Sequence, residues 1–178
     1  MLDIKKIKNV NNIADPKIRK QLKLDFLSKI KKVKDKAIRS DFLTFVKYIW
    51  PDFIEGNHHQ TISDKFNRLK SGELKRLIIN MPPRHTKSEF ASYFLPAWMI
   101  GNDPKLKIIQ ATHTAELAVR FGRKTKNLID SAEYREIFNT RLQEDSKAAG
   151  RWETDKGGEY FAVGDRKASC RERVSSPV

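Results

Sequence analysis

Cysteine is almost absent from this sequence, which has only Cys170 among its 178 residues. One cysteine cannot form an internal disulfide, and Cys170 stands at no metal-ligand spacing, so a disulfide scaffold and a cysteine metal site are excluded. No segment approaches the length of a membrane span, and residues 1–6 lack the apolar stretch of a secretory signal. These absences predict one domain with a sizeable core, no membrane partner and a reducing, cytoplasmic location.

Acidic residues are scarce relative to basic ones: 22 Asp and Glu stand against 36 Lys and Arg, for a formal net charge of +14. Residues 1–40 contain 13 basic and 4 acidic residues, a difference of +9, which leaves +5 for the rest. Basic surface of this density favours a polyanion, because neutralised phosphates release counterions. A solvated, lysine-rich helix face is the alternative explanation for residues 1–40.

Glycine is missing from the most informative stretch of the chain. Here an apolar run, Leu77–Asn80, is followed by turn-prone residues, then by Lys87 and Ser88 and a helix-like segment. A loop between a strand and a helix N-terminus can turn several backbone N–H groups toward one anion, and the helix dipole adds favourable potential. Lys87 would then contact the β- and γ-phosphates of a nucleotide, and Ser88 would ligate Mg²⁺. The order of elements predicts a nucleotide-binding loop.

This loop departs from the common pattern G-x-x-x-x-G-K-[ST], because Met81 and Thr86 stand where that pattern has glycine. Glycine is favoured there because the loop needs positive φ angles and a close approach of backbone to phosphate. The alternative is an ordinary proline-containing turn with a basic rim. Arg84 adds a cation that could stabilise charge on the γ-phosphate, unless it is a surface arginine without that role. The residues predicted to contact phosphates are Pro83, Arg84, His85, Thr86, Lys87 and Ser88.

Apolar periodicity and capping residues predict an amphipathic helix from Pro16 and then an alternation of helices and strands. The later helices are expected at Phe42–Trp50 (cap Ser40 or Asp41), Asn57–Gly72 (cap Asn57), about Ser88–Ile100 with a kink at Pro96, Thr112 or Thr114 to about Ile129, and Ser131–Phe138. Short buried strands are expected at Leu77–Asn80, Leu106–Ala111 and Glu159–Val163, and little periodicity is found at 139–157. The helical spacing of the aromatic residues in 42–50 favours the core over a base-stacking platform. The pattern predicts an α/β fold with a parallel sheet covered on both faces.

The loop Met-Pro-Pro-Arg-His-Thr-Lys-Ser-Glu at 81–89 looks like the variant Walker A loop of the large terminase subunits of tailed phages. Loops of that family often lack a standard glycine and carry arginine. The segments Phe45–Gln60, Ile108–His113 and Gly158–Ala162 resemble the same family's N-terminal ATPase region, in the same order. The resemblance covers about Phe42–Gly164.

The resemblance implies a P-loop NTPase-like parallel sheet with flanking helices, with a basic helical segment at 1–40, the first part of an ATPase domain at 41–164, and an incomplete sheet. It implies ATP and Mg²⁺ as cofactors and ATP-driven packaging of double-stranded DNA into capsids. The full-length family protein also has the portal and the small terminase subunit as partners. It acts in the cytoplasm of the infected bacterial host and transiently at the procapsid portal.

The resemblance also implies that the segment His58-His59-Gln60 contacts the adenine, with the Gln60 amide reading its edge. A polar first turn of a helix is the alternative. A metal pair at His58 and His59 is not expected, because adjacent residues on a helix point in different directions. Arg120 and Arg123 are candidates for an arginine that reaches a neighbouring subunit's nucleotide.

An ATPase of this class needs a second apolar strand that ends in Asp, usually followed by Glu, to hold Mg²⁺ and to activate water. In the family this strand follows the segment matched by Gly158–Gly164, whereas residues 165–178 contain no apolar strand. Asp165 is a poor substitute, since a glycine precedes it and no Glu follows. We interpret 165–178 as a foreign tail from a frameshift, an early stop or a cloning junction.

We therefore expect weak nucleotide binding and little turnover. We expect no DNA cleavage either, because the family's nuclease lies in a C-terminal domain that the sequence does not contain. Two alternatives stay open: a basic nucleic-acid-binding module, and an inactive truncated product with a vestigial phosphate loop.

Overall fold

The computed structural model describes residues 16–143, 145 and 148–164 and falls into two compact units, Met1–Ala37 and Ile38–Val178. Helices and a small mixed sheet make up the described chain, so the α/β class is confirmed. The interpretation of 165–178 as a foreign tail, with Asp165 and Cys170, lies outside the described residues. Within the described part, no helix is both long and apolar enough to cross a membrane.

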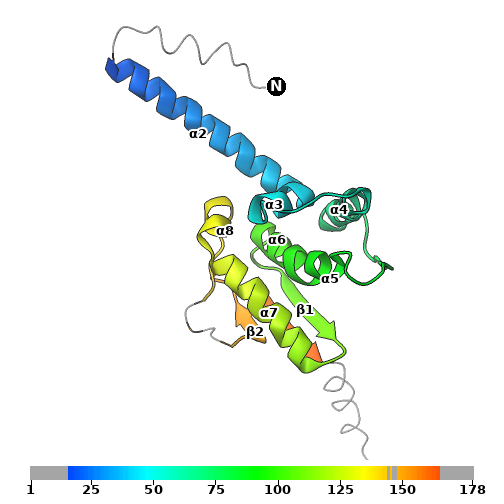
Figure 1. Ribbon diagram of the computed structural model, residues 1–178. Coiled ribbons are helices and arrows are strands. Elements are labelled where there is room, and N and C mark those ends of the chain that lie inside the picture. Colours follow the sequence, from blue (N-terminus) through cyan, green and yellow to red (C-terminus); the bar gives the residue numbers. More distant parts are fainter. Residues whose placement is uncertain (1–15, 144, 146–147, 165–178) are drawn as a thin grey trace, which may run out of the picture. The chain divides into compact units, whose positions relative to one another are not determined.

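The first unit contains α2 (Pro16–Ser40), whose residues from Ile38 onward begin the second unit. Figure 1 shows α2 as one uninterrupted helix, which confirms the helix predicted from Pro16. Several of its apolar side chains are exposed, with Ile18 at 52% and Val33 at 57%, whereas Ile38 is buried. Ten of its 25 residues are Lys or Arg, so its surface is strongly basic.

The helices of the second unit follow the predicted order, whereas its strands follow it only in part. They are α3 (Phe42–Ile49), α4 (Asn57–Lys70), α5 (Lys87–Glu89), η1 (Phe90–Phe94), α6 (Leu95–Asn102), β1 (Lys107–Thr112), α7 (Ala115–Asp130), α8 (Ala132–Ile137), β2 (Arg151–Glu153) and β3 (Glu159–Gly164). The predicted caps Asp41, Thr114 and Ser131 each accept a hydrogen bond from a backbone N–H of the helix they precede. The predicted cap Asn57 is wrong by one residue, because Gly56 takes the N-cap position.

An aromatic cluster forms the core of the second unit. The ring centroid of Phe42 lies 4.9 Å from that of Phe66, 5.4 Å from Phe90 and 5.6 Å from Trp98, all in edge-on geometry. These four side chains are at most 1% exposed. The prediction that the aromatic residues of 42–50 belong to the core is confirmed for Phe42 and Phe45, which are fully buried, and is wrong for Trp50, which is 36% exposed. Such pairs add stability beyond the area they bury.

The sheet has three strands in the order β1-β3-β2, with β1 parallel and β2 antiparallel to β3. The expectation of a purely parallel sheet is therefore wrong, because β2 was not predicted. Trp152 of β2 is fully buried and stacks on Tyr160 of β3 with ring centroids 4.7 Å apart. One cross-strand aromatic pair thus holds a strand of three residues whose sequence lacks periodicity.

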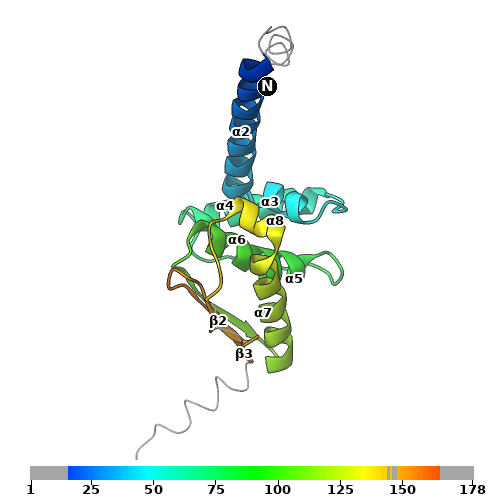
Figure 2. The same cartoon turned by 90° about the vertical axis from the view of Figure 1, so that its left-hand side faces the viewer.

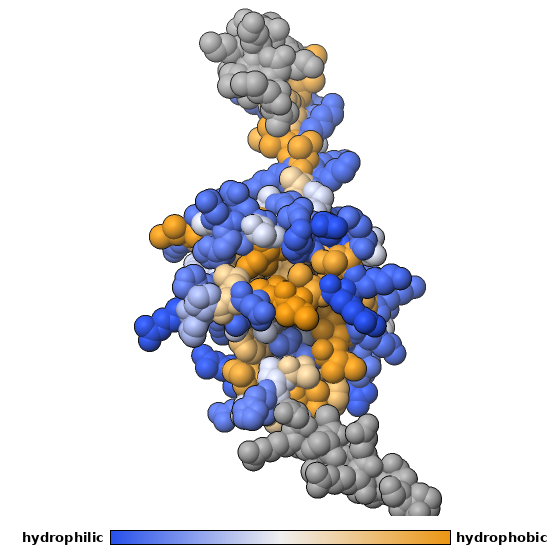
Figure 3. Space-filling model, turned by 90° about the vertical axis from the view of Figure 1, so that its right-hand side faces the viewer, coloured by the Kyte–Doolittle hydropathy of each residue, from blue (hydrophilic) through white to orange (hydrophobic). Residues whose placement is uncertain are grey.

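Helix α7 packs on one face of the sheet (Figures 1 and 2). On the other face the neighbouring residues Ile109 and Phe161 are 73% and 39% exposed, so the prediction of a sheet covered on both faces is wrong for the described residues. Figure 3 shows apolar side chains gathered at the centre of one side of the second unit and bordered by hydrophilic residues.

The segment Leu77–Asn80, predicted as a buried strand, forms no strand. Leu77 and Ile79 pack against the core, whereas Ile78 between them is 86% exposed. A strand needs a neighbour to pair its backbone N–H and C=O groups, and this segment pairs with none of the described strands. The apolar run therefore reflects one-sided packing against the core.

Gly122 lets α7 approach the sheet. A Cβ at this position would lie 2.6 Å from the Ala149 carbonyl oxygen and 3.1 Å from the Tyr160 ring, and the Gly122 carbonyl accepts a 3.3 Å hydrogen bond from Trp152 Nε1.

Alanine at position 122 would be favoured over glycine by helix propensity, by about 1 kcal/mol, but overpacking costs about 1–3 kcal/mol. We expect Gly122→Ala to lower the free energy of unfolding by about 1 kcal/mol in urea titrations. Asn127→Ala, on the exposed side of the same helix, is the control; a stabilised Gly122→Ala protein would contradict the packing described here.

Candidate functional site

The predicted phosphate-binding loop adopts positive φ without glycine. Arg84 has φ 66° and Thr86 has φ 57°, and they are the only non-glycine residues of the described chain with positive φ. Thr86 holds the position directly before Lys87, where the common pattern has its second glycine. The left-handed conformation is strained for a β-branched residue and costs about 1–3 kcal/mol. The backbone therefore takes the form that glycine usually provides, and other contacts must stabilise it.

A continuous helical segment, Lys87–Asn102, follows the loop and begins at the predicted lysine. A π-helical turn at Phe90–Phe94 interrupts it, with the N–H of Leu95 bonded to the carbonyl of Phe90. The kink was predicted at Pro96, and the irregularity lies just before it. Pro96 has no N–H and its ring crowds the preceding turn, which explains why the helix widens there.

The side chains of the loop lie at and near the surface. Lys87 Nζ donates a 3.1 Å hydrogen bond to the carbonyl of Met81, so the ammonium closes the loop at the position of the first missing glycine. Pro83, Arg84, His85 and Ser88 are exposed, and His85 Nδ1 lies 2.9 Å from the carbonyl of Pro83. The structure thus brings the predicted residues 83–88 together on one turn that opens to solvent.

His59 of α4 joins the loop through a directed chain of hydrogen bonds. The N–H of Gly56 donates to His59 Nδ1 over 2.9 Å, and His59 Nε2 lies 2.7 Å from Thr86 Oγ1. Because Nδ1 accepts, the neutral ring carries its proton on Nε2 and donates it to Thr86. Thr86 Oγ1 in turn donates to the carbonyl of His85 over 2.7 Å.

The His59 ring is 5% exposed and lies between two phenylalanines. Its centroid is 4.8 Å from that of Phe53 and 5.1 Å from that of Phe90. Burial lowers the pKa of the His59 imidazole below its usual value, and the neighbouring His58 lowers it further. Glu55 opposes this shift, and His85 adds the smallest lowering effect. The site therefore favours the neutral ring that the hydrogen bonds require.

Gln60, predicted to read adenine, is exposed and donates a 2.7 Å hydrogen bond to Glu55 Oε1. The expectation that the adjacent side chains of His58 and His59 point in different directions is wrong, because their ring centroids are only 3.8 Å apart. Both nitrogens of His59 are instead engaged, by Gly56 and by Thr86. Within the described residues, no group of three or more His, Cys, Asp or Glu side chains is placed to hold a metal ion.

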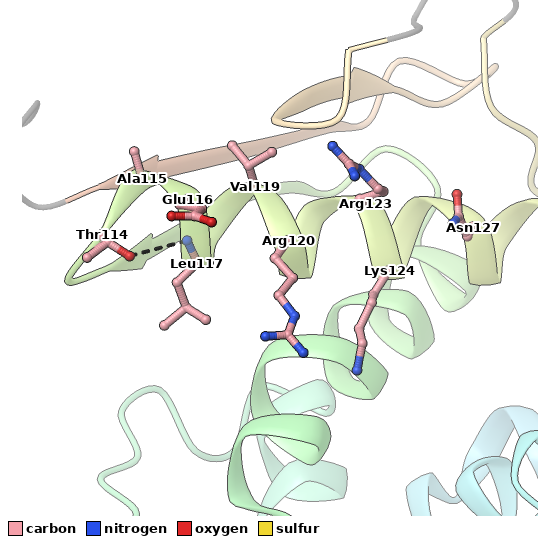
Figure 4. Close-up of a pocket in the computed structure, with 9 residues that line it drawn as sticks. All are labelled: Thr114, Ala115, Glu116, Leu117, Val119, Arg120, Arg123, Lys124 and Asn127. Atoms are coloured by element: carbon pink, nitrogen blue, oxygen red, sulfur yellow. Dashed lines mark hydrogen bonds between the residues drawn. The ribbon is translucent and has the colours of Figure 1, made fainter.

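A groove of about 810 Å³ runs along α7. Figure 4 shows Arg120 and Lys124 extending to one side of the helix and Arg123 to the other. Lys124 Nζ binds Glu89 Oε1 at 2.9 Å and so links α7 to the helical segment after the loop. The two arginines considered for a neighbouring subunit thus lie on opposite flanks of α7.

The hydrogen bond between His59 and Thr86 was not predicted, although the segment 58–60 was expected to lie near adenine. The sequence does indicate that such a contact is needed. Thr86 is β-branched and stands where the pattern requires positive φ, so its backbone conformation needs a stabilising contact from elsewhere in the fold. No pattern in the sequence identifies the residue that supplies it, because 27 positions separate the two.

The chain matches no protein-family model, no curated protein and no solved structure. The function inferred for it therefore rests on the residues and the geometry of the loop.

The pKa of His59 makes stability depend on pH. Because the folded-state pKa lies below the unfolded value of about 6.5, the stabilisation is fully present above that value and is lost as pH falls through and below it. We expect the free energy of unfolding to decrease between about pH 7.5 and pH 5.5, and to decrease less in His59→Gln. Urea titrations at several pH values measure this slope. The other histidines are common to both proteins, so equal slopes would show that His59 is not held neutral.

Proposed function

We propose that this chain is the N-terminal ATPase portion of a phage terminase large subunit and that it binds ATP with Mg²⁺ through its variant Walker A loop. The observation that carries the proposal is the backbone of the loop. Arg84 and Thr86 adopt positive φ directly before Lys87, where a 16-residue helical segment begins. A loop of this form can present successive N–H groups to one phosphate group.

The residues of the loop fit a nucleotide with its metal. Residues 83–88 would cradle the phosphates, and Lys87 would exchange the Met81 carbonyl for phosphate oxygens, which are stronger acceptors for an ammonium. The exposed Ser88 hydroxyl would be the protein ligand of Mg²⁺, with phosphate oxygens and waters completing its shell. Bound Mg²⁺ neutralises charge on the β- and γ-phosphates. Arg84 would add a cation at the γ-phosphate, and Gln60 would contact the adenine after leaving Glu55.

Turnover by this chain is proposed to be poor. Hydrolysis needs a carboxylate to activate water and another to hold the metal. The acid nearest in sequence to Lys87 is Glu89, and Lys124 holds its carboxylate. The sequence of residues 165–178 contains no apolar run that ends in Asp and Glu.

Double-stranded DNA is the proposed polyanionic partner, since α2 carries ten basic and two acidic residues. In a full-length terminase the same region would work with the portal and the small subunit in the cytoplasm of the infected host and at the procapsid. These partners and this location extend the resemblance of the loop and its flanking segments to the whole protein.

Titration of a fluorescent ATP analogue with Mg²⁺ tests the phosphate loop. We expect saturable binding by the chain and at least a tenfold weaker affinity for Lys87→Ala, because loss of a charge-assisted contact costs about 1.5–3 kcal/mol. Lys105→Ala, an exposed lysine away from the loop, is the matched control.

Equal binding by the chain and Lys87→Ala would contradict the proposal. A basic nucleic-acid-binding module would show instead salt-dependent DNA binding that ignores Lys87→Ala.

Steady-state phosphate release tests the proposal that turnover is poor. We expect turnover far below the roughly 1–1000 s⁻¹ typical of enzymes, even at saturating nucleotide. The carboxylate of Glu89 is held by Lys124, and the sequence of 165–178 has no apolar run that ends in Asp and Glu. Rates within that range would show that another group of this chain supplies the base.

A further inference from the structure

We propose that His59 is a positioning residue that holds the phosphate loop in its binding conformation by anchoring Thr86 in the left-handed region. The inference rests on the proposed nucleotide binding and names a residue that the Walker A pattern does not contain. Its role is to replace, from a distant helix, the conformational freedom that glycine gives to the common loop.

The direction of each hydrogen bond supports this role. A backbone N–H can only donate, so the bond from Gly56 fixes the lone pair on His59 Nδ1 and leaves the proton on Nε2. His59 Nε2 therefore donates to Thr86 Oγ1, 2.7 Å away. The Thr86 hydroxyl donates in turn to the carbonyl of His85. The chain of bonds therefore fixes the Thr86 side chain relative to the backbone of its own loop.

The ring itself has little freedom to move. Phe53 and Phe90 enclose it, and Gly56 at the start of α4 fixes its tilt. Phe90 belongs to the helical segment that begins at Lys87. His59 thus contacts the loop at Thr86 and the helix after it at Phe90, on both sides of the phosphate-binding lysine.

This arrangement predicts that the requirement for His59 depends on the residue at position 86. Threonine in the left-handed conformation needs an anchor, whereas glycine adopts that conformation without strain. Thr86→Gly should therefore remove most of the effect of changing His59. A role of His59 in core packing alone would predict the same loss in both backgrounds.

The experiment measures the affinity of the full chain for the fluorescent ATP analogue with Mg²⁺ in four proteins: unchanged, His59→Phe, Thr86→Gly and the double variant. Phenylalanine keeps the ring between Phe53 and Phe90 but removes both hydrogen bonds. We expect His59→Phe to weaken binding about tenfold in the threonine background and less than about threefold in the glycine background. His59→Gln, which keeps a donor for Thr86, should restore part of the affinity. His113→Phe, at an exposed histidine, is the control.

A second measurement separates this inference from the proposed function. Amide hydrogen exchange needs no nucleotide, and the N–H of Phe90, which donates to the Thr86 carbonyl over 2.9 Å, reports on the loop. His59→Phe should accelerate exchange at Phe90 in the threonine background but not in the Thr86→Gly background. If the unchanged chain binds no nucleotide while exchange behaves in this way, the proposed function fails and the positioning role stands. Equal effects of His59→Phe in both backgrounds, in affinity and in exchange, or no effect in either, would overturn the inference. If His59→Phe does not fold, Thr86→Val supplies the comparison, because it replaces the hydroxyl that His59 binds with a methyl group and keeps the β-branched side chain. Exchange as slow as in the unchanged chain would overturn the inference.

Discussion

Burial of Phe90 is the constraint on which both the core and the loop depend. Its fully buried ring contacts Phe42 in the aromatic cluster and also Phe53 and His59 beneath the loop. Phe90 follows Lys87 within one helical turn, so the start of the helical segment is fixed by the same side chain that completes the core. Since interiors are close-packed and transmit strain, a shift of this ring would move His59 and with it Thr86. The core thus stabilises the loop, although its side chains at Pro83, Arg84, His85 and Ser88 are exposed.

The sequence predicts most of the helices because their signals are local. Asp41, Thr114 and Ser131 each bind a backbone N–H three residues away, and apolar residues repeat within a few turns. The strands β1 and β3 are also close to their predicted bounds, because short apolar runs between turns mark them. The loop pattern predicted a helix start at about Ser88, one residue from the observed start at Lys87.

Features that depend on distant partners were not predictable in the same way. Strand β2 exists because Trp152 stacks on Tyr160, and its own sequence carries no periodicity. The run Leu77–Asn80 has the composition of a strand but pairs with none of the described strands, and composition cannot supply a neighbour. The exposure of Ile109 was not predictable for the same reason. An apolar strand pattern indicates that a face of the sheet is apolar, but it does not identify an element that covers that face.

The two departures of the loop from the common pattern have a shared physical meaning. Where that pattern has glycine, this chain has Met81, whose side chain packs against the core, and Thr86, whose hydroxyl is bound to His59. Glycine makes the left-handed backbone accessible but also increases the freedom that binding must remove. Side chains tied to the core and to a buried histidine reach the same backbone with less freedom left to lose, so the loop is organised before any anion arrives. A phosphate loop without glycine is therefore consistent with binding, provided that the contacts replacing glycine come from elsewhere in the fold, and here they come from α4 and from the core.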